Sequence, residues 1–94
     1  MNKNEAQILI GEILSEYRKK DYLTLKRLIK TEIKTGEIIG KSGTEYHYEI
    51  QLFWDDKKNG NIRVMVNIDD GGLRVFRPLS NDFIKSSNNT FIGE

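Results

Sequence analysis

The chain has 94 residues, of which 37% are hydrophobic and 31% are charged, with a formal net charge of +1 and no cysteine. This length suits one domain over residues 1–94, and the composition argues against a disordered chain and against a membrane protein. Without cysteine, disulfides, thiolate metal sites and cysteine nucleophiles are excluded. We expect a cytoplasmic protein, because the sequence shows no secretion leader and no membrane-spanning segment.

The first predicted element is an amphipathic helix from about Lys3 to Lys19. Its apolar stripe comprises Ala6, Leu9, Ile10, Ile13, Leu14 and Tyr17. These residues are spaced by three or four positions, as one face of a helix requires. Asn2 or Asn4 can cap the first turn by accepting a backbone N–H.

A second, shorter helix is predicted directly after the first, with Asp21 as its N-terminal cap. Its shared apolar face comprises Tyr22, Leu25, Leu28 and Ile29. The alternation in Leu23-Thr24-Leu25 also admits a strand, so both interpretations stay open.

Beyond residue 31 the period of the apolar residues changes to two, which predicts strands. The first strand covers about Ile33 to Ile39 and ends in a glycine-containing turn at 40–43. The second covers 46–54 and is followed by the polar turn 55–60. The third covers 62–68, and a fourth strand is expected after the next turn.

The turn after the third strand predicts how the third strand pairs with the fourth. Asp70-Gly71 suits a two-residue type I′ turn, because both positions need positive φ and these residues tolerate it. The resulting pairs are Ile68 with Leu73, Val66 with Val75, Asn67 with Arg74, and Met65 with Phe76. Pro78 has no N–H to donate, so the fourth strand is expected to stop there or to run at a sheet edge.

These elements predict an α+β fold, in which an N-terminal helix or helices pack on one face of a four-stranded antiparallel meander sheet. The architecture is similar to the cystatin-like or NTF2-like class of curved sheets. The other face of the sheet, here called the outer face, would then carry three large apolar side chains, those of Phe53, Met65 and Phe76. The polar residues around them are His47, Glu49, Arg63 and Arg74.

The outer face is the predicted binding site. Apolar patches rimmed by charge, with arginine and aromatic residues near the centre, are typical of protein interfaces. We therefore expect a small non-enzymatic interaction module, of the immunity or accessory type, that binds a protein partner or a second copy of itself. Its predicted partner-binding residues are Phe53, Arg63, Met65, Arg74 and Phe76.

The alternative for the outer face is that the polar C-terminal tail folds back over it. The anchors for such a cover would be Phe83, Ile84 and Phe91. In that arrangement the apolar side chains of the outer face belong to the core.

A second function class is nucleic-acid binding through the basic segment 18–34. Seven of its residues are basic, against Asp21 and Glu32, and phosphate binding needs such a cluster. A run of charge is also common on a solvated helix face, and no motif for base stacking accompanies it.

A third class is a small enzyme centred on His47, the only histidine of the chain. Glu49 lies two residues along on the same strand face, so the two could form an acid–base pair. A single histidine and carboxylate specify no reaction. The chain is therefore predicted not to be an enzyme, and no catalytic residue, cofactor or metal site is predicted.

Two further motifs are weak. Residues 36–42, GEIIGKS, resemble a phosphate-binding loop but have three residues between the glycines where four are needed, and a strand follows instead of a helix. The loop 55–60 resembles a calcium loop, yet Lys57 and Val66 occupy ligand positions. A turn and a solvated hairpin tip are the interpretations favoured for these two segments.

Several segments in the second half of the chain resemble small bacterial proteins of unassigned function. They are Phe53-Trp54-Asp55-Asp56-Lys57, Asn61-Ile62-Arg63-Val64, Ile68-Asp69-Asp70-Gly71-Gly72, Arg74-Val75-Phe76, Pro78-Leu79 and Asp82-Phe83-Ile84. In that pattern an aromatic residue follows the double glycine, where this chain has Leu73. The resemblance implies a small free-standing domain, and it implies no activity, ligand or catalytic residue.

Overall fold

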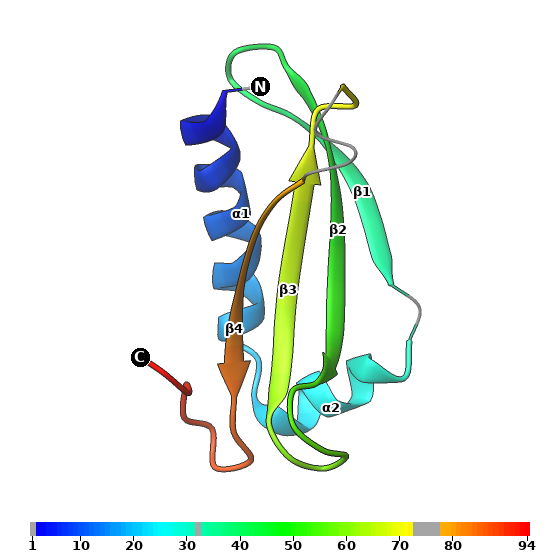
Figure 1. The fold of residues 1–94 in the computed structure, drawn as a ribbon, viewed down its shortest axis with the longest axis vertical. Helices are drawn as coiled ribbons and strands as arrows, with labels where there is room; N and C mark the ends of the chain where they lie inside the picture. The colour runs from blue at the N-terminus through cyan, green and yellow to red at the C-terminus, as the bar shows by residue number, and fades with distance from the viewer. Residues whose placement is uncertain (1, 32, 73–77) are drawn as a thin grey trace.

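The computed structural model describes residues 2–31, 33–72 and 78–94 of the chain. They form the helices α1 (Lys3–Arg18) and α2 (Tyr22–Ile29) and the strands β1 (Lys34–Ile39), β2 (Glu45–Trp54), β3 (Ile62–Asp69) and β4 (Leu79–Lys85). The strands make one antiparallel sheet in the order β1-β2-β3-β4, so each lies beside its neighbour in sequence (Figure 1). The predicted α+β class and the meander sheet are confirmed.

Both helices begin at side chains that the sequence indicates as caps. Asn2 Oδ1 accepts a hydrogen bond from the Glu5 amide at 3.0 Å, and Asp21 Oδ1 accepts one from the Thr24 amide at 2.9 Å. These bonds satisfy backbone donors that have no partner inside the helix. Of the two interpretations of residues 22–29, helix or strand, the structure shows the helix.

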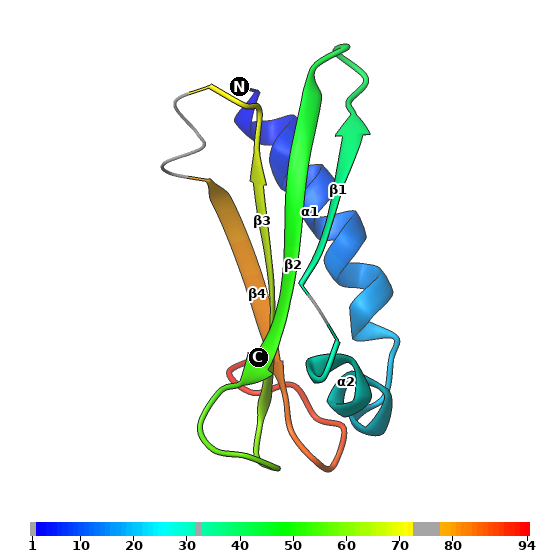
Figure 2. The same cartoon turned by 90° about the vertical axis from the view of Figure 1, so that its right-hand side faces the viewer.

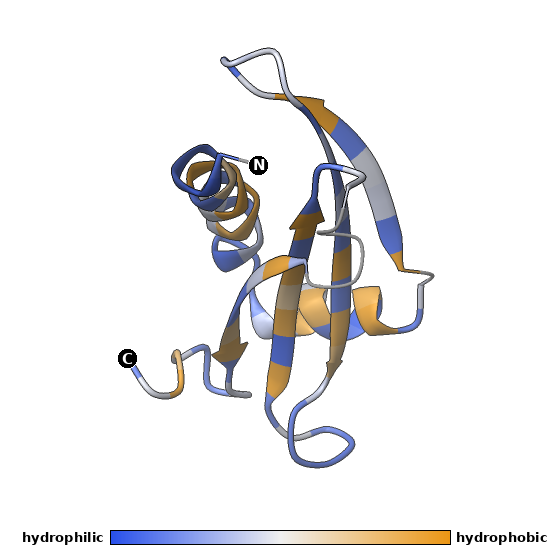
Figure 3. Ribbon diagram, turned by 45° about the horizontal axis from the view of Figure 1, so that its top comes forward, coloured by the Kyte–Doolittle hydropathy of each residue, from blue (hydrophilic) through white to orange (hydrophobic). Residues whose placement is uncertain are grey.

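Both helices cover the same face of the sheet (Figure 2). Helix α1 contacts β3 and β4, whereas α2 contacts β2 and β3. Every second residue of β3 is buried, and Figure 3 shows this alternation as hydrophobic and hydrophilic bands along the strand. The core between the helices and the sheet comprises Ala6, Ile10, Leu14, Tyr22, Leu25, Tyr46, Ile50, Ile62, Val64, Val66, Ile68 and Phe83.

The predicted pairing of β3 is wrong. The observed pairs include Ile68 with Leu79, Asn67 with Ser80, Val66 with Asn81 and Met65 with Asp82. Pro78 precedes the fourth strand instead of ending it, a place where its missing N–H costs no ladder hydrogen bond. This pairing also puts Phe83 opposite Val64 in the core. Burying such a ring contributes about 2–3 kcal/mol, which favours the observed pairing.

The predicted partners of β3 on the far side of the turn lie outside the described residues; they are Leu73, Arg74, Val75 and Phe76. The carboxylates of the turn serve its own backbone. Asp69 Oδ1 accepts from the Gly71 amide at 2.9 Å, and Asp70 Oδ1 accepts from the Gly72 amide at 3.2 Å. Gly71 has a φ of 83°, which a residue with a side chain adopts only with strain. The acidic pair therefore stabilises the turn.

The C-terminal tail packs on the helix side of β4. The Phe91 ring meets the core residue Phe83 edge to face, with 5.6 Å between centroids, and the Arg18 guanidinium lies 4.0 Å from the Phe91 centroid. Arg18 also forms an ion pair with Glu94. The alternative in which Phe83 and Phe91 cover the outer face is therefore wrong. Ile84 does lie on the outer face, as part of β4 itself.

Glu5 ties α1 to the turn between β1 and β2. Its carboxylate accepts hydrogen bonds from the Ser42 hydroxyl at 2.7 Å, the Ser42 amide at 3.0 Å and the buried Tyr46 hydroxyl at 2.8 Å. Gly40 passes so close that a Cβ at this position would overlap the carboxylate. The hydrogen bonds from Ser42, and after them that from Tyr46, lower the pKa of Glu5.

We expect the free energy of unfolding of Glu5→Gln to depend less on pH under acidic conditions than that of the wild type. Because the pKa of Glu5 is lower in the folded chain, its carboxylate contributes stability above the ordinary pKa of 4.5, and this contribution is lost as the pH falls through the lowered value. Urea unfolding at steps from about pH 3 to pH 7 measures the effect. Glu12→Gln, which changes an exposed carboxylate of the same helix, should keep the wild-type profile. Identical profiles for wild type and Glu5→Gln would contradict the expectation.

Candidate functional site

The outer face of the sheet lies opposite both helices (Figure 2). Its side chains follow from the strand pairing, since residues opposite one another share a face and alternate residues point to opposite faces. From β1 to β4 they are Thr35, Glu37, Ile39, Glu45, His47, Glu49, Gln51, Phe53, Arg63, Met65, Asn67, Asp69, Ser80, Asp82 and Ile84. None of these residues is buried in the structure.

Apolar side chains gather on one part of the outer face. Phe53, Arg63 and Ile84 form one row across β2, β3 and β4, and Met65 lies in the next row, diagonal to both Phe53 and Ile84. Residues in such positions are within reach of one another when their side chains are long. Phe53 remains 36% exposed. We call Phe53, Met65 and Ile84 the outer apolar patch.

Arg63 is held in place beside this patch by two carboxylates. Its Nε donates to Asp55 Oδ1 at 2.9 Å, its Nη2 lies 2.8 Å from the same oxygen, and its Nη1 forms an ion pair with Asp82. The bond to Asp55, followed by that to Asp82, raises the pKa of Arg63. Guanidinium groups fixed in this way present a rigid polar rim.

The structure therefore brings together three of the five predicted site residues. Phe53, Arg63 and Met65 lie on the outer face as predicted, whereas Arg74 and Phe76 lie outside the described residues. The prediction missed Ile84 and Asp82, whose place beside β3 depends on the corrected pairing. Residues 79–85 read LSNDFIK, in which apolar and polar residues do not alternate, so no periodic pattern marked this strand in the sequence.

The other end of the outer face is acidic. Glu37 and Asp69 lie opposite His47 on its two neighbouring strands, and His47 Nδ1 is 3.6 Å from Glu37 Oε1. One potential ligand atom each from Glu37, Glu45 and His47 lies within 4.8 Å of the other two. Such donors are chemically able to hold a divalent cation, and all three side chains are at the surface. We call Glu37, Glu45, His47 and Asp69 the acidic corner.

The contacts of His47 differ from the expected acid–base pair. His47 meets Glu37 across the strand pair, whereas Glu49 accepts a hydrogen bond from Gln51. His47, Glu49 and Asp69 line a shallow hollow of about 330 Å³. A histidine beside carboxylates specifies no reaction by itself, and an enzyme centred on His47 stays an untested alternative.

The two weak motifs of the sequence have structural roles. Residues 36–42 form the end of β1 and the following turn, and the next element is β2. In the loop between β2 and β3, Asp56 Oδ1 accepts from the Lys57 amide at 2.8 Å and the Asn61 amide at 2.9 Å, while Asp55 is engaged by Arg63. These contacts support the interpretation as a turn and a hairpin tip.

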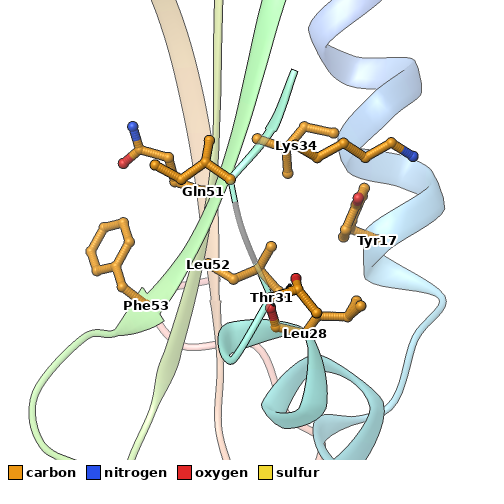
Figure 4. Close-up of a pocket in the computed structure, with 9 residues that line it drawn as sticks. Tyr17, Leu28, Thr31, Lys34, Gln51, Leu52 and Phe53 are labelled. Carbon is orange, nitrogen blue, oxygen red and sulfur yellow. Dashed lines mark hydrogen bonds between the residues drawn. The ribbon is translucent and has the colours of Figure 1, made fainter. Parts of the chain in front are cut away.

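A second concave region lies at the edge of the sheet. Strand β1 pairs with β2 only from Lys34, which lies opposite Ile50, whereas β2 continues to Trp54. Beside this end of β2 is a hollow of about 240 Å³ between the sheet and both helices, which we call the edge hollow (Figure 4). Its lining includes Tyr17, Leu28, Ile33, Lys34, Leu52 and Phe53.

The basic segment 18–34 is partly neutralised by ion pairs. Arg18 pairs with Glu94, and Lys19 pairs with Glu16 at 3.3 Å. In the described part of the chain, no ion pair is formed by Lys26, Lys30 or Lys34. Nucleic-acid binding through this segment stays an untested alternative.

Comparisons with protein families, curated proteins and solved structures found no match. Neither of the two described helices has the length and apolarity needed to cross a bilayer.

Proposed function

We propose that this protein is a non-enzymatic interaction module that binds a partner protein through the outer face of its sheet. The observation that carries the proposal is the outer apolar patch, because Phe53, Met65 and Ile84 lie together on the face opposite both helices. The solvent face of an antiparallel sheet is usually polar, and apolar groups that gather on it commonly mark an interface. Arg63, fixed beside the patch, matches the residue preferences of interface centres.

The charges around the patch favour a partner with a basic rim. The carboxylates of the outer face are Glu37, Glu45, Glu49, Asp69 and Asp82. Among the described residues of this face, the arginine is Arg63, and it is already paired with Asp55 and Asp82. A partner surface with an apolar centre and surrounding lysine or arginine would complement this pattern.

The partner in this proposal can also be a second copy of the chain. Such a dimer has to keep the two acidic corners apart, because they repel each other. A twofold axis through the outer apolar patch would achieve this, because it carries the two corners to opposite ends of the interface. Self-association is therefore measured first. Size-exclusion chromatography with light scattering at about 100 µM detects dimers with a dissociation constant of about 100 µM or tighter.

We expect Met65→Asp to abolish partner binding without unfolding the chain. A charge in the centre of the patch is desolvated on binding, so affinity should fall by about 30-fold or more. The wild-type chain and the variant are immobilised in parallel and exposed to an extract of the source cells. Any protein retained by the wild type is then purified, and its affinity for both chains is measured by calorimetry.

Ile8→Asp is the matched control for this experiment. It introduces the same charge at an exposed apolar residue of α1, on the opposite side of the molecule from the outer face. This control should bind the partner with wild-type affinity. Equal affinity of the wild type and Met65→Asp, or a wild-type chain that is monomeric and retains no protein, would contradict the proposed function. Far-ultraviolet circular dichroism verifies that both variants are folded.

A further inference from the structure

The edge hollow combines an apolar wall with an exposed apolar rim. Leu28 of α2 and Leu52 of β2 line it, and both pack against the core. Ile33 and Phe53 also line it, and they remain 57% and 36% exposed. Figure 4 shows Tyr17 and Leu28 on the helix side of β2, and Phe53 projecting on the other side. An apolar group of a ligand could therefore replace water against several side chains at once.

Two hydrogen-bond donors of the edge hollow have no partner among the described residues. Neither the Tyr17 hydroxyl nor the Lys34 ammonium group makes a hydrogen bond or an ion pair with any described residue. Lys20 adds a further positive charge, since its Nζ lies 5.6 Å from the centroid of the Tyr17 ring. No carboxylate is among the described residues that line the hollow. The polar part of this site thus favours an anionic oxygen.

The size of the hollow limits what it can hold. Its volume of about 240 Å³ is below the roughly 300–1,000 Å³ typical of sites for drug-sized ligands. A body the size of one ring or a short alkyl chain suits it. The main chain of β2 from Gln51 to Trp54 has no neighbouring β1 residue on this side, so the hollow is open at the sheet edge.

We propose that the edge hollow binds a small organic carboxylate with an apolar body. The apolar body lies against Leu28, Leu52 and the rim residues Ile33 and Phe53. The carboxylate accepts hydrogen bonds from the Lys34 ammonium and the Tyr17 hydroxyl. The edge hollow shares Phe53 with the outer apolar patch, but its binding of a carboxylate does not rest on the proposed function.

The probe for this site is 3-phenylpropionate, which joins one ring to a carboxylate. Its titration into uniformly ¹⁵N-labelled protein, followed by amide chemical shifts, should give saturable changes at the residues around the edge hollow. The neutral analogue 3-phenylpropionamide keeps the ring and the shape but lacks the charge. It should bind about tenfold more weakly, because charge-assisted hydrogen bonds are the stronger ones.

Conservative variants separate the roles of the two donors. Lys34→Met keeps the length of the side chain and should weaken 3-phenylpropionate binding by about tenfold, while leaving the affinity for the amide almost unchanged. Tyr17→Phe keeps the ring and should weaken carboxylate binding by about threefold. Lys30→Met removes an exposed lysine at the end of α2 that does not line the hollow, and it should bind as the wild type does.

The proposal is overturned by any of three results. They are amide shifts that do not saturate or that map elsewhere, equal affinity for the acid and the amide, and an unchanged affinity in Lys34→Met. Met65→Asp distinguishes this site from the outer apolar patch, because it should lose the partner protein and still bind 3-phenylpropionate. Loss of both binding events in folded Met65→Asp would show that the two sites are one.

Discussion

Ile10→Ala is expected to lower the free energy of unfolding by about 3 kcal/mol. Ile10 is completely buried in the core, and α1 rests on β3 and β4. Truncation to alanine removes buried methyl groups and leaves a cavity that the surrounding side chains fill only in part. A domain of this size has a total stability of about 5–14 kcal/mol, so this loss is a large share of it. The midpoint of thermal unfolding should fall by about 12–20 °C.

Ile8→Ala is the control for that measurement. It makes the same chemical change two residues away on the same helix, where the side chain is 62% exposed. Its effect on unfolding should be within about 0.5 kcal/mol of zero. Chemical denaturation of the two variants, analysed with a common m-value, gives the comparison. Similar losses in both variants would mean that the face of α1 toward the sheet is not the one described.

Lys85→Met is expected to destabilise the protein by about 2 kcal/mol. Lys85 is the charged residue that the structure buries, with 6% of its surface exposed. Its Nζ donates to the main-chain oxygens of Lys20 at 2.7 Å and Arg18 at 3.3 Å, and it lies 4.9 Å from the Phe91 centroid. The ammonium thus sits at the carboxyl end of α1, where the helix dipole favours a positive charge.

Two opposing effects decide whether Lys85→Met lowers or raises the free energy of unfolding. Methionine relieves the cost of burying a charge, but it leaves two carbonyl oxygens without their donor. We expect the second effect to prevail, because removing one partner of a buried, charge-assisted hydrogen bond costs more than the pair contributes in net terms. Lys19→Met, at an exposed lysine of the same region, should change stability by less than about 0.5 kcal/mol. Thermal unfolding of Lys85→Met at or above the wild-type midpoint would refute this account.

The outer apolar patch and the edge hollow share Phe53. Its ring lies in the row of Arg63 and Ile84, and it also lines the hollow beside β2. A change at Phe53 therefore cannot tell the two sites apart. Met65 and Lys34 each belong to one of them, which is why the two binding experiments use Met65→Asp and Lys34→Met.

Helices and strands were predicted well because their signals are local. The three- and four-residue spacing from Ala6 to Tyr17 and the two-residue spacing from Ile62 to Ile68 each describe one face of an element. The same reasoning does not distinguish a helix from a strand at Tyr22 to Ile29. The choice between them was decided by a cap at Asp21 together with packing of α2 against the sheet.

Part of the candidate site was also predicted from the sequence, because alternation along a strand is a local signal. Alternation along β2 and β3 is enough to place Phe53, Arg63 and Met65 on one face, whatever strand comes next. Which residues complete that face depends on the partner strand. The turn at Asp70-Gly71 indicated Phe76 opposite Met65, and the structure has Asp82 there. Ile84, and with it the extent of the outer apolar patch, could not be found until this pairing was known.

The edge hollow is the feature that the sequence was least able to predict. Tyr17, Leu28 and Leu52 lie in three different elements, and the hollow exists because β1 leaves β2 at Lys34 while both helices stay on the sheet. No spacing along the chain reports such an arrangement. The amino-acid sequence by itself determined the element types and the inner and outer faces of β2 and β3, because hydrophobic periodicity and capping act over a few residues. Only the tertiary structure decided the pairing of β4, the course of the tail and the two concave regions, because these depend on how distant segments share one core.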